Sequence, residues 1–442
     1  MKFSSSALLA ILSAIVTVQA GSTKKVSYEG VGYSGSYQDV TAMDEDSGSC
    51  SQESKSFSGK LAPLDEELSA HFRGPLKLLQ FGVYYPSSGS SNKKREDEEE
   101  CTTKHVHHKH KRATEVVEVT QTVIVDGNGN TQTSLATTTA TAGSGNDDDQ
   151  DTTQTSTASA AATGGSGSGS DSGSKKGSSA SSSSSASSSE SSSESSSDSS
   201  VAAGDWERVA YYTPGSADNV TFLNYYGGSG SGVWSSSFGN SLSYANSDAS
   251  GGSSESVALD ETTIDSNVEY VIMSGSKCDG DDCGFYREGI PAYHGFDGNT
   301  KIMVFEFEMP TATDSASYNY DMPAIWLLNA KIPRTLQYGN EKCSCWKTGC
   351  GELDLFEVIT SGSDELICHL HDGQGSNGSA QGGGGSSDYF ERPTSGSMKA
   401  AVIFSNGEIN VVQVDDDFGS SLDSSTVKSW TSQSGSKAIL QG

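Results

Sequence analysis

The stretch CSCWKTGCGELDLFEVI, residues Cys343 to Ile359, places acids in a run that otherwise resembles a buried strand. Its three acids are Glu352, Asp354 and Glu357. Alternate residues of a strand share one face, so Glu352 and Asp354 point the same way. Glu357 follows Glu352 by five residues and would point to the opposite face of a regular strand.

A single β-bulge between Asp354 and Glu357 restores the match, because one extra residue inverts the alternation beyond it. The bulge places all three acids on one face and turns Leu353 and Val358 toward the core. We therefore predict a bulged strand whose acids line one cleft.

Two carboxylates held close together on a rigid sheet suit glycoside hydrolysis. One attacks or stabilises the anomeric carbon, and the other protonates the leaving oxygen. The proton donor needs a raised pKa, which partial burial and neighbouring negative charge provide. The alternative is a solvated acidic strand face, and the spacing of the acids does not by itself decide between the two.

The chain has 442 residues and a formal net charge of −29, which argues against nucleic acid as a partner. Residues 1–20 have a basic start, an apolar centre and a small-residue end, so we predict a secretory signal peptide. The last residues carry no apolar tail, and we expect no membrane anchor. We expect a secreted, extracellular monomer.

Composition divides the rest of the chain into three parts. Residues 21–86 mix short β-prone runs with glycine and proline, and we expect them to pack with the C-terminal domain. Residues 87–204 contain charged blocks and a long Ser/Thr-rich tract with too few apolar residues to fold. Residues 205–442 return to short β-prone runs separated by glycine and asparagine turns.

The middle part carries several local signals. Two dibasic pairs, Lys94-Arg95 and Lys111-Arg112, resemble sites for a kexin-type processing protease. Four histidines between them suit metal binding or, as we prefer, a solvated basic tract. Residues 113–130 alternate like a lone strand, which must pair, aggregate or stay extended. Residues 131–200 are predicted to form a disordered stalk.

The folded parts predict an all-β protein, a β-sandwich or jelly roll braced by disulfides and interrupted by a long disordered insertion. No convincing amphipathic helix is present. The runs QFGVYYP (residues 80–86) and RVAYYTP (residues 208–214) are similar. They are either a weak repeat or, as we prefer, neighbouring strands of one sheet on either side of the insertion.

Secretion makes disulfides the expected state of the eight cysteines, with connectivity undetermined. The disulfide candidates are Cys278, Cys283, Cys343, Cys345, Cys350 and Cys368. Their spacing is poor for zinc, and the aspartates near residues 279–282 and 415–417 match no calcium loop, so we expect no metal and no cofactor. Asn219 and Asn377 begin glycosylation sequons.

Aromatic and histidine side chains near the acids are candidates for substrate binding. Trp326 lies in the strand before the acids, and Trp346 lies between Cys345 and Cys350, where a disulfide would hold it rigid. For each tryptophan, core packing is the alternative. His369 and His371 share a strand face and could bond a sugar hydroxyl or a carboxylate.

The sequence GELDLFEV matches the E-x-D-x-x-E signature of the laminarinase branch of glycoside hydrolase family sixteen, and MPAIWLL (residues 322–328) resembles the strand before it. More closely, the folded parts on both sides of the insertion resemble the fungal cell-wall proteins of the Tos-one family. The resemblance implies a jelly roll, with Glu352 as nucleophile, Asp354 as helper acid and Glu357 as general acid/base.

The implied function is retaining hydrolysis or transglycosylation of cell-wall β-1,3-glucan, in cell-wall organisation. The glycine-rich loops and the dense cysteine cluster before the signature depart from the family-sixteen pattern. A non-catalytic glucan-binding or structural cell-wall protein is the alternative.

Overall fold

The computed structural model describes residues 20–87, 120–125, 131–136, 205–337, 339–374 and 382–440. The chain forms two units, one of Met1–Lys94 with Ser197–Gly442 and the other of Arg95–Ser196. The signal peptide, the histidine tract, both dibasic pairs, Cys101 and Asn377 lie outside the described residues.

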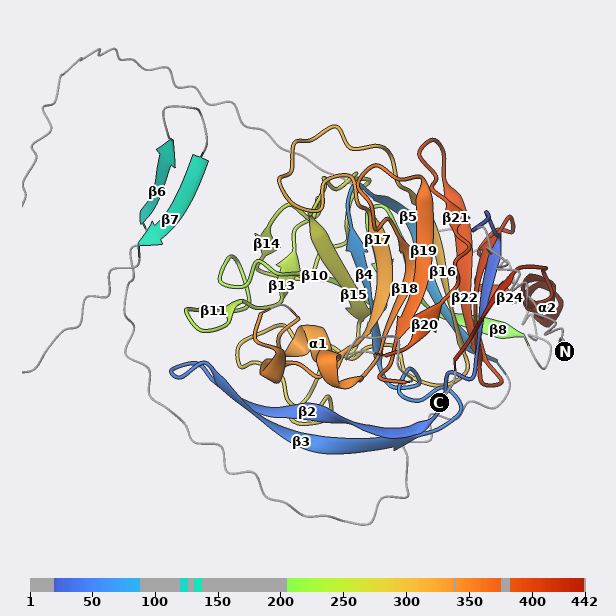
Figure 1. Cartoon of the computed structure of the whole chain (residues 1–442), viewed down its shortest axis with the longest axis horizontal. Helices are drawn as coiled ribbons and strands as arrows, with labels where there is room; N and C mark the ends of the chain where they lie inside the picture. The colour runs from blue at the N-terminus through green and yellow to red at the C-terminus, as the bar shows by residue number, and fades with distance from the viewer. Residues whose placement is uncertain are drawn as a thin grey trace, which may run out of the picture. The chain divides into compact units, whose positions relative to one another are not determined.

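The larger unit contains two large sheets (Figure 1). The nine-stranded sheet consists, in spatial order, of β24 (Ser421–Leu422), β8 (Trp206–Thr213), β5 (Lys77–Pro86), β16 (Lys301–Glu308), β22 (Met398–Ser405), β23 (Glu408–Val414), β1 (Lys25–Glu29) and β25 (Ser436–Ile439), with β9 (Ser216–Asp218) paired to β8.

The ten-stranded sheet carries the acids. It consists, in spatial order, of β14 (Gly252–Ser253), β13 (Ser243–Ala245), β10 (Val220–Asn224), β15 (Glu269–Ser274), β4 (Leu68–Arg73), β17 (Ala324–Asn329), β18 (Glu352–Glu357), β19 (Glu365–His371) and β20 (Gly384–Gly385), with β21 (Phe390–Glu391) paired to β19.

Smaller elements complete this unit. They are the hairpins β2–β3 (Ser34–Asp44 and Ser49–Ser58) and β11–β12 (Trp234–Ser235 and Gly239–Asn240), the helices α1 (Lys331–Arg334) and α2 (Ser424–Thr431), and the 3-10 turns η1 (Glu341–Cys343) and η2 (Trp346–Thr348). The long β2–β3 hairpin lies along one end of the ten-stranded sheet (Figure 1).

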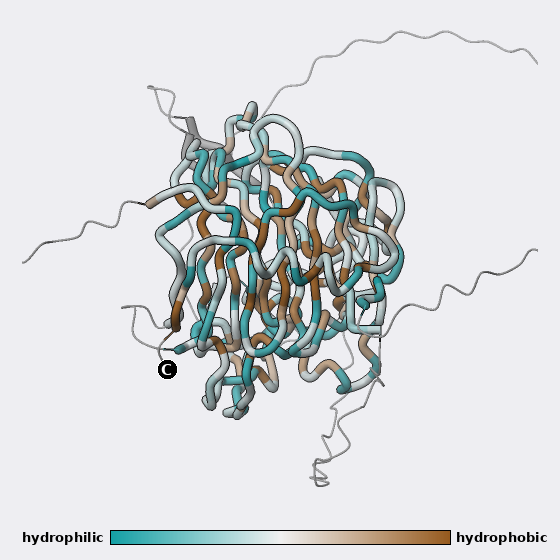
Figure 2. Tube along the Cα trace, turned by 90° about the vertical axis from the view of Figure 1, so that its right-hand side faces the viewer, coloured by the Kyte–Doolittle hydropathy of each residue, from teal (hydrophilic) through white to brown (hydrophobic). Residues whose placement is uncertain are grey.

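The main core lies between the two sheets because each contributes one apolar face to it. Phe305 and Phe307 of β16 and Ile325 and Leu327 of β17 are fully buried in the same cluster. Rings also meet there, with the Phe307 and Phe356 centroids 5.2 Å apart. Figure 2 shows hydrophobic segments recurring along neighbouring strands of the body. This is the alternating pattern of a sandwich and confirms the predicted fold class.

The two similar runs of sequence are neighbouring strands. β5 and β8 pair antiparallel, with Pro86 opposite Trp206, and the Ser87 amide donates to the Asp205 carbonyl at 2.7 Å. Residues 88–204 are therefore inserted between two ends that lie side by side. The segment before the insertion also supplies β1 and β4, so it contributes strands to both sheets.

Two described elements were not predicted. Helix α2 buries Val427 and Trp430, but its serine-rich sequence gives only a weak apolar stripe. In the second unit, β6 (Thr120–Val125) pairs with β7 (Thr131–Ala136), so residues 131–136 are a strand rather than part of the disordered tract. Within the described residues, no helix is long and apolar enough to cross a membrane.

Candidate active site

The predicted bulge is present in β18. Ile325 lies opposite Phe356 and Trp326 lies opposite Asp354, so Leu355 is the extra residue. The register between β18 and β19 shifts between Asp354 and Glu357 as well. Leu355 and Phe356 are both fully buried in the core, and these two consecutive apolar residues explain why the alternation breaks there.

As a result, Glu352, Asp354 and Glu357 share the sheet face that points away from the core, here called the acidic face. Leu353 and Val358 are fully buried on the other side, as predicted. The charges of Asp354 and Glu357 both act on Glu352, which places the three carboxyl groups in one electrostatic cluster.

Glu357 is paired with an arginine from the segment before the insertion. Arg73 of β4 places Nη2 3.0 Å from Glu357 Oε1 and donates from Nε to the Met322 carbonyl at 2.8 Å. The side chains of Arg73 and Glu357 are 12% and 27% exposed. This half-buried ion pair is screened by solvent less than an exposed pair would be.

Asp354 is the most enclosed of the acids, with a side chain 11% exposed. Its pKa is raised well above the usual range by burial and then by the charge of Glu357. His371 of β19 places Nε2 3.4 Å from Asp354 Oδ2. Burial and the neighbouring carboxylate therefore both favour the protonated form of Asp354.

His369 and His371 do share one face beside the acids, with ring centroids 4.5 Å apart. Burial, and then the charge of His371, lowers the pKa of His369 to about 4. His369 is therefore a neutral ring near neutral pH and offers a hydrogen bond rather than a charge.

Glu352 accepts a hydrogen bond from the indole N–H of Trp346. Burial, and then the charge of Asp354, raises the pKa of Glu352 to about 8, while the Trp346 hydrogen bond and His371 act in the opposite direction. Once Asp354 is protonated, its contribution to this shift disappears.

Trp346 is positioned by the cysteines around it. It begins η2, inside the loop that the Cys345–Cys350 disulfide closes. In the same loop, the Thr348 hydroxyl accepts a hydrogen bond of 3.0 Å from the backbone amide of Gln38 in the β2–β3 hairpin. Trp346 thus lies within a short loop closed by two of the predicted disulfide candidates. Trp346 is partly buried and contacts a carboxylate directly.

Two further disulfides hold neighbouring loops. Cys50 of β3 is bonded to Cys343, and Cys278 is bonded to Cys283. The prediction for Cys368 was wrong, because it is a free, fully buried cysteine in the core.

Trp326 and His71, a histidine that was not predicted, lie beside Asp354 on neighbouring strands. Trp326 is opposite Asp354, and His71 is opposite Trp326. Trp326 is 5% exposed and its ring lies 5.2 Å from that of His71. His71 is fully buried, and burial lowers its pKa to about 3. Among the described residues, the Nδ1 atoms of His71 and His371 have no hydrogen-bond partner. Trp326 therefore lies on the acidic face but exposes little area for stacking.

Sequence reasoning missed Arg73 and His71, although a signal was available. The run LSAHFR alternates apolar residues with Ser69, His71 and Arg73, which is the pattern of a half-buried strand. The local pattern does not show which strands lie beside β4. Its neighbours, β15 and β17, lie far along the chain.

One described group has the composition of a metal site: Cys278, Asp282, Cys283 and His294 offer ligand atoms within 4.8 Å of one another. The two cysteines are joined as a disulfide, so they offer no thiolate. His294 instead contacts Glu67 at 2.5 Å and Asp282 at 3.2 Å. We therefore interpret this group as a structural ion-pair network.

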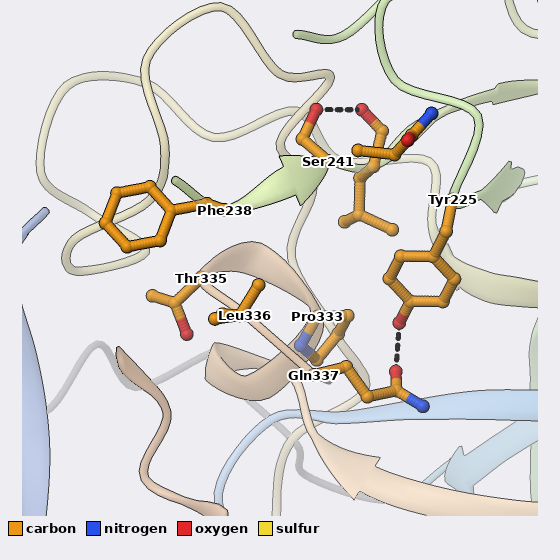
Figure 3. A pocket seen from close by; sticks show the side chains of 9 residues that line it. Tyr225, Phe238, Ser241, Pro333, Thr335, Leu336 and Gln337 are labelled. Carbon is orange, nitrogen blue, oxygen red and sulfur yellow. Dashed lines mark hydrogen bonds between the residues drawn. The ribbon is translucent and has the colours of Figure 1, made fainter. Parts of the chain in front are cut away.

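A separate cavity of about 240 Å³ lies among loops that follow β10 and α1 (Figure 3). Tyr225 and Phe238 line it, and the Tyr225 hydroxyl donates to Gln337. None of the three acids lines this cavity. The sequon residue Asn219 is exposed, and its side-chain nitrogen donates to the Val209 carbonyl at 3.0 Å.

The fold and the acidic face define the class: a disulfide-braced β-sandwich with three carboxylates on one sheet face. Residues 204–430 match the family model "Cell wall protein YJL171C/Tos1, C-terminal", and residues 24–86 match its N-terminal counterpart. The chain belongs to this family of cell wall proteins. No solved structure matches it.

Curated relatives cover the whole chain. The chain is 59% identical over 465 residues to "Probable circularly permuted 1,3-beta-glucanase TOS1" of Candida albicans, with 100% of each protein covered. It is 49% identical over 468 residues to the Saccharomyces cerevisiae protein of the same name, with 99% of each covered. It is 32% identical to "Probable circularly permuted 1,3-beta-glucanase PGA52" of C. albicans, over 98% of this chain and 88% of that protein.

Proposed function

We propose that this protein is a secreted cell-wall glycosidase that cleaves or transfers β-1,3-glucan by a retaining mechanism. The bulge at Leu355 carries the proposal, because it gathers Glu352, Asp354 and Glu357 on one face. Retaining chemistry needs two such groups, one to form a glycosyl ester and one to move a proton. The names of the relatives supply the substrate class.

In the proposed reaction, Glu352 attacks the anomeric carbon while Glu357 protonates the leaving oxygen. Glu357 then removes a proton from water or from a sugar hydroxyl, which attacks the same carbon and releases Glu352. The Trp346 N–H holds Glu352 in place, and protonated Asp354 removes the negative charge that would oppose a charged Glu352.

The electrostatics of the free protein also favour a second assignment, with the roles of the two glutamates exchanged. Arg73 pairs with Glu357, which suits a charged nucleophile, and burial raises the pKa of Glu352 to about 8, which suits a proton donor. We retain Glu352 as nucleophile because the order of the acids matches the family-sixteen signature and because protonation of Asp354 relieves Glu352.

The first test is activity itself. The purified protein is incubated with β-1,3-glucan oligosaccharides, and the products are identified by mass. Shorter products indicate hydrolysis and longer ones transfer, whereas unchanged oligosaccharides that still bind the protein would favour a non-catalytic glucan-binding role. Glu352→Gln should abolish turnover. Asp354→Asn should lower turnover less than a substitution of Glu352 or Glu357 does.

Azide rescue distinguishes the two assignments. With an activated β-glucoside, azide replaces a missing nucleophile on the opposite face of the sugar and gives an α-azide. In a variant that lacks the acid/base, azide attacks the glycosyl ester and gives a β-azide. We expect the α-azide from Glu352→Ala and the β-azide from Glu357→Ala, and the reverse pattern would exchange the roles. Glu357→Ala should lower the rate of glucan cleavage by roughly 10²–10⁴-fold.

A further inference from the structure

Three large side chains are exposed on two loops beyond the Glu357 end of β18. Tyr318 is 70% exposed, Tyr320 is 40% exposed and Ile359 is 60% exposed. Ile359 follows Glu357 by two residues, so the alternation of an extended chain continues the acidic face through it. Exposed side chains of this kind near a group of acids offer apolar surface to a ligand.

The loop that carries the tyrosines is bonded directly to the residues after Glu357. The Tyr320 carbonyl accepts a hydrogen bond from the Ser361 hydroxyl at 2.6 Å. The Asp321 carbonyl accepts one from the Gly362 backbone amide at 3.1 Å. Both donors come from the turn that follows β18.

The same attachment continues toward the site. The Met322 carbonyl accepts Nε of Arg73 at 2.8 Å, and the Pro323 carbonyl accepts the Val358 amide at 3.0 Å. Arg73 is the residue that holds Glu357. The loop is thus joined to the acidic face by backbone contacts at four successive residues.

A buried ion pair and a side-chain hydrogen bond fix this loop. Asn319 and Asp321 have φ angles of 48° and 52°, a left-handed turn conformation that Asn and Asp adopt more readily than other side-chain-bearing residues. Asp321 is nearly fully buried and lies 2.5 Å from Arg392, and it also accepts the Ala312 amide at 3.0 Å.

We propose that Tyr318, Tyr320 and Ile359, here called the rim, bind the part of the β-1,3-glucan chain on the leaving-group side of the bond that is cleaved. This inference rests on the proposed function. The general acid touches the leaving oxygen, and the rim lies just beyond Glu357, next to the residues that follow it in the chain. A held tyrosine ring offers a flat apolar face to a sugar ring at little entropic cost.

The same surface would bind the acceptor in transfer. After the leaving group departs, a hydroxyl of an acceptor glucan on the rim attacks the anomeric carbon of the glycosyl ester. The bond between that carbon and Glu352 breaks, and the proton of the hydroxyl passes to Glu357. The rim would therefore raise the share of transfer over hydrolysis by holding a sugar where water would otherwise react.

The test compares Tyr318→Ala/Tyr320→Ala with Tyr318→Phe/Tyr320→Phe, which keeps both rings. For the alanine double variant we expect KM for β-1,3-glucan oligosaccharides to rise by about tenfold and transfer products to fall relative to hydrolysis. The phenylalanine double variant should behave like the unmodified protein. Ile359→Ser should raise KM about threefold, while Ile439→Ser, a change at a site 67% exposed on β25 of the other sheet, should not.

If the protein is active and the alanine double variant has unchanged KM and products, the rim assignment is wrong and the proposed function stands. If the unmodified protein has no activity, the proposed function fails, and sedimentation with insoluble β-1,3-glucan still decides the rim. Loss of binding in the alanine variant alone would support it, and equal binding by all variants would overturn it.

Discussion

The thiol of Cys368 contacts Leu355, the bulge residue, which has no register partner on β17 or β19. Its Sγ is 2.7 Å from the Leu355 carbonyl oxygen, deep in the core. Burial raises the pKa of this thiol well above its usual range, so it remains protonated and can donate. A structural cysteine of this kind stabilises the bulge, and the bulge orients Glu357.

We therefore predict different outcomes for two substitutions at this position. Cys368→Ser keeps a donor and should retain most stability and activity. Cys368→Val removes it and leaves the Leu355 carbonyl unsatisfied, which should lower the free energy of unfolding by roughly 1–3 kcal/mol. The valine variant should also lose kcat with little change in KM. Denaturant unfolding and kinetics on β-1,3-glucan measure both effects, and equal behaviour of the two variants would contradict this role.

Glu352 makes stability depend on pH in a definite direction. Its pKa rises from the ordinary 4.5 to about 8 in the folded protein, so between these values the folded state binds more protons than the unfolded state. The contribution of Glu352 is thus present below about pH 4.5 and is lost as the pH rises toward 8. The free energy of unfolding should fall over this range, and Glu352→Gln should flatten the decline.

Thermal unfolding at several pH values measures this dependence. Glu207→Gln, an exposed change on β8, serves as the control and should leave the slope as it is. A slope that is unchanged in Glu352→Gln would show that other groups cause the pH dependence.

The β2–β3 hairpin has no backbone pairing with either large sheet, and Tyr37 packs it against Trp326 and Leu328 of β17. Its strands pair only with each other, and the Cys50–Cys343 disulfide and an Asp39–Lys331 contact of 2.7 Å attach it to the segments around Trp346. The disulfide joins residues 293 apart, whereas Cys278 and Cys283 are 5 apart. A longer closed loop restricts the unfolded chain more.

Replacing both Cys50 and Cys343 by serine should therefore lower the free energy of unfolding by roughly 2–5 kcal/mol. It should also increase proteolysis within the hairpin. The matched Cys278→Ser/Cys283→Ser change should cost less. Chemical unfolding under non-reducing conditions measures the difference, and an equal or larger cost for the second pair would contradict the loop-length argument.

The sequence predicted β18 well and its surroundings poorly. Leu355 and Phe356 are consecutive apolar residues between acids, and this local pattern indicates a bulge. The shared acidic face could therefore be inferred from the sequence. The pairing of Arg73 with Glu357 could not, because 284 residues separate them. Cys368 was misjudged because the sequence does not show which cysteines lie close together: Cys343 and Cys350 are just as buried, yet both are bonded.

At the scale of the whole molecule, the insertion leaves and re-enters at adjacent strand ends. We predict that replacing residues 88–204 by a short glycine-asparagine turn leaves the larger unit folded, because β5 and β8 already pair antiparallel up to Pro86 and Trp206. Shortening this loop lowers the entropy cost of closing it. The thermal midpoint should stay the same or rise slightly, and a large fall would show that the insertion packs against the sheets.

Cleavage at Lys111-Arg112 would likewise leave one assembly rather than two fragments. The Cys50–Cys343 disulfide joins a residue before the insertion to one after it. In addition, β1, β4 and β5, which precede the insertion, each lie between two strands that follow it. After such processing, the pieces should run as one band on non-reducing denaturing gels and as two bands after reduction. Two bands without reduction would contradict the disulfide.

The place of β4 between β15 and β17 has a consequence during synthesis. β4 ends at Arg73, but β17, which ends at Asn329, leaves the ribosome only some 256 residues later. At about 5–20 residues per second, this interval is on the order of tens of seconds. Throughout it the early strands have exposed edges and apolar faces that would aggregate if left alone. We therefore expect the newly made N-terminal segment to be prone to aggregation until its later partners arrive.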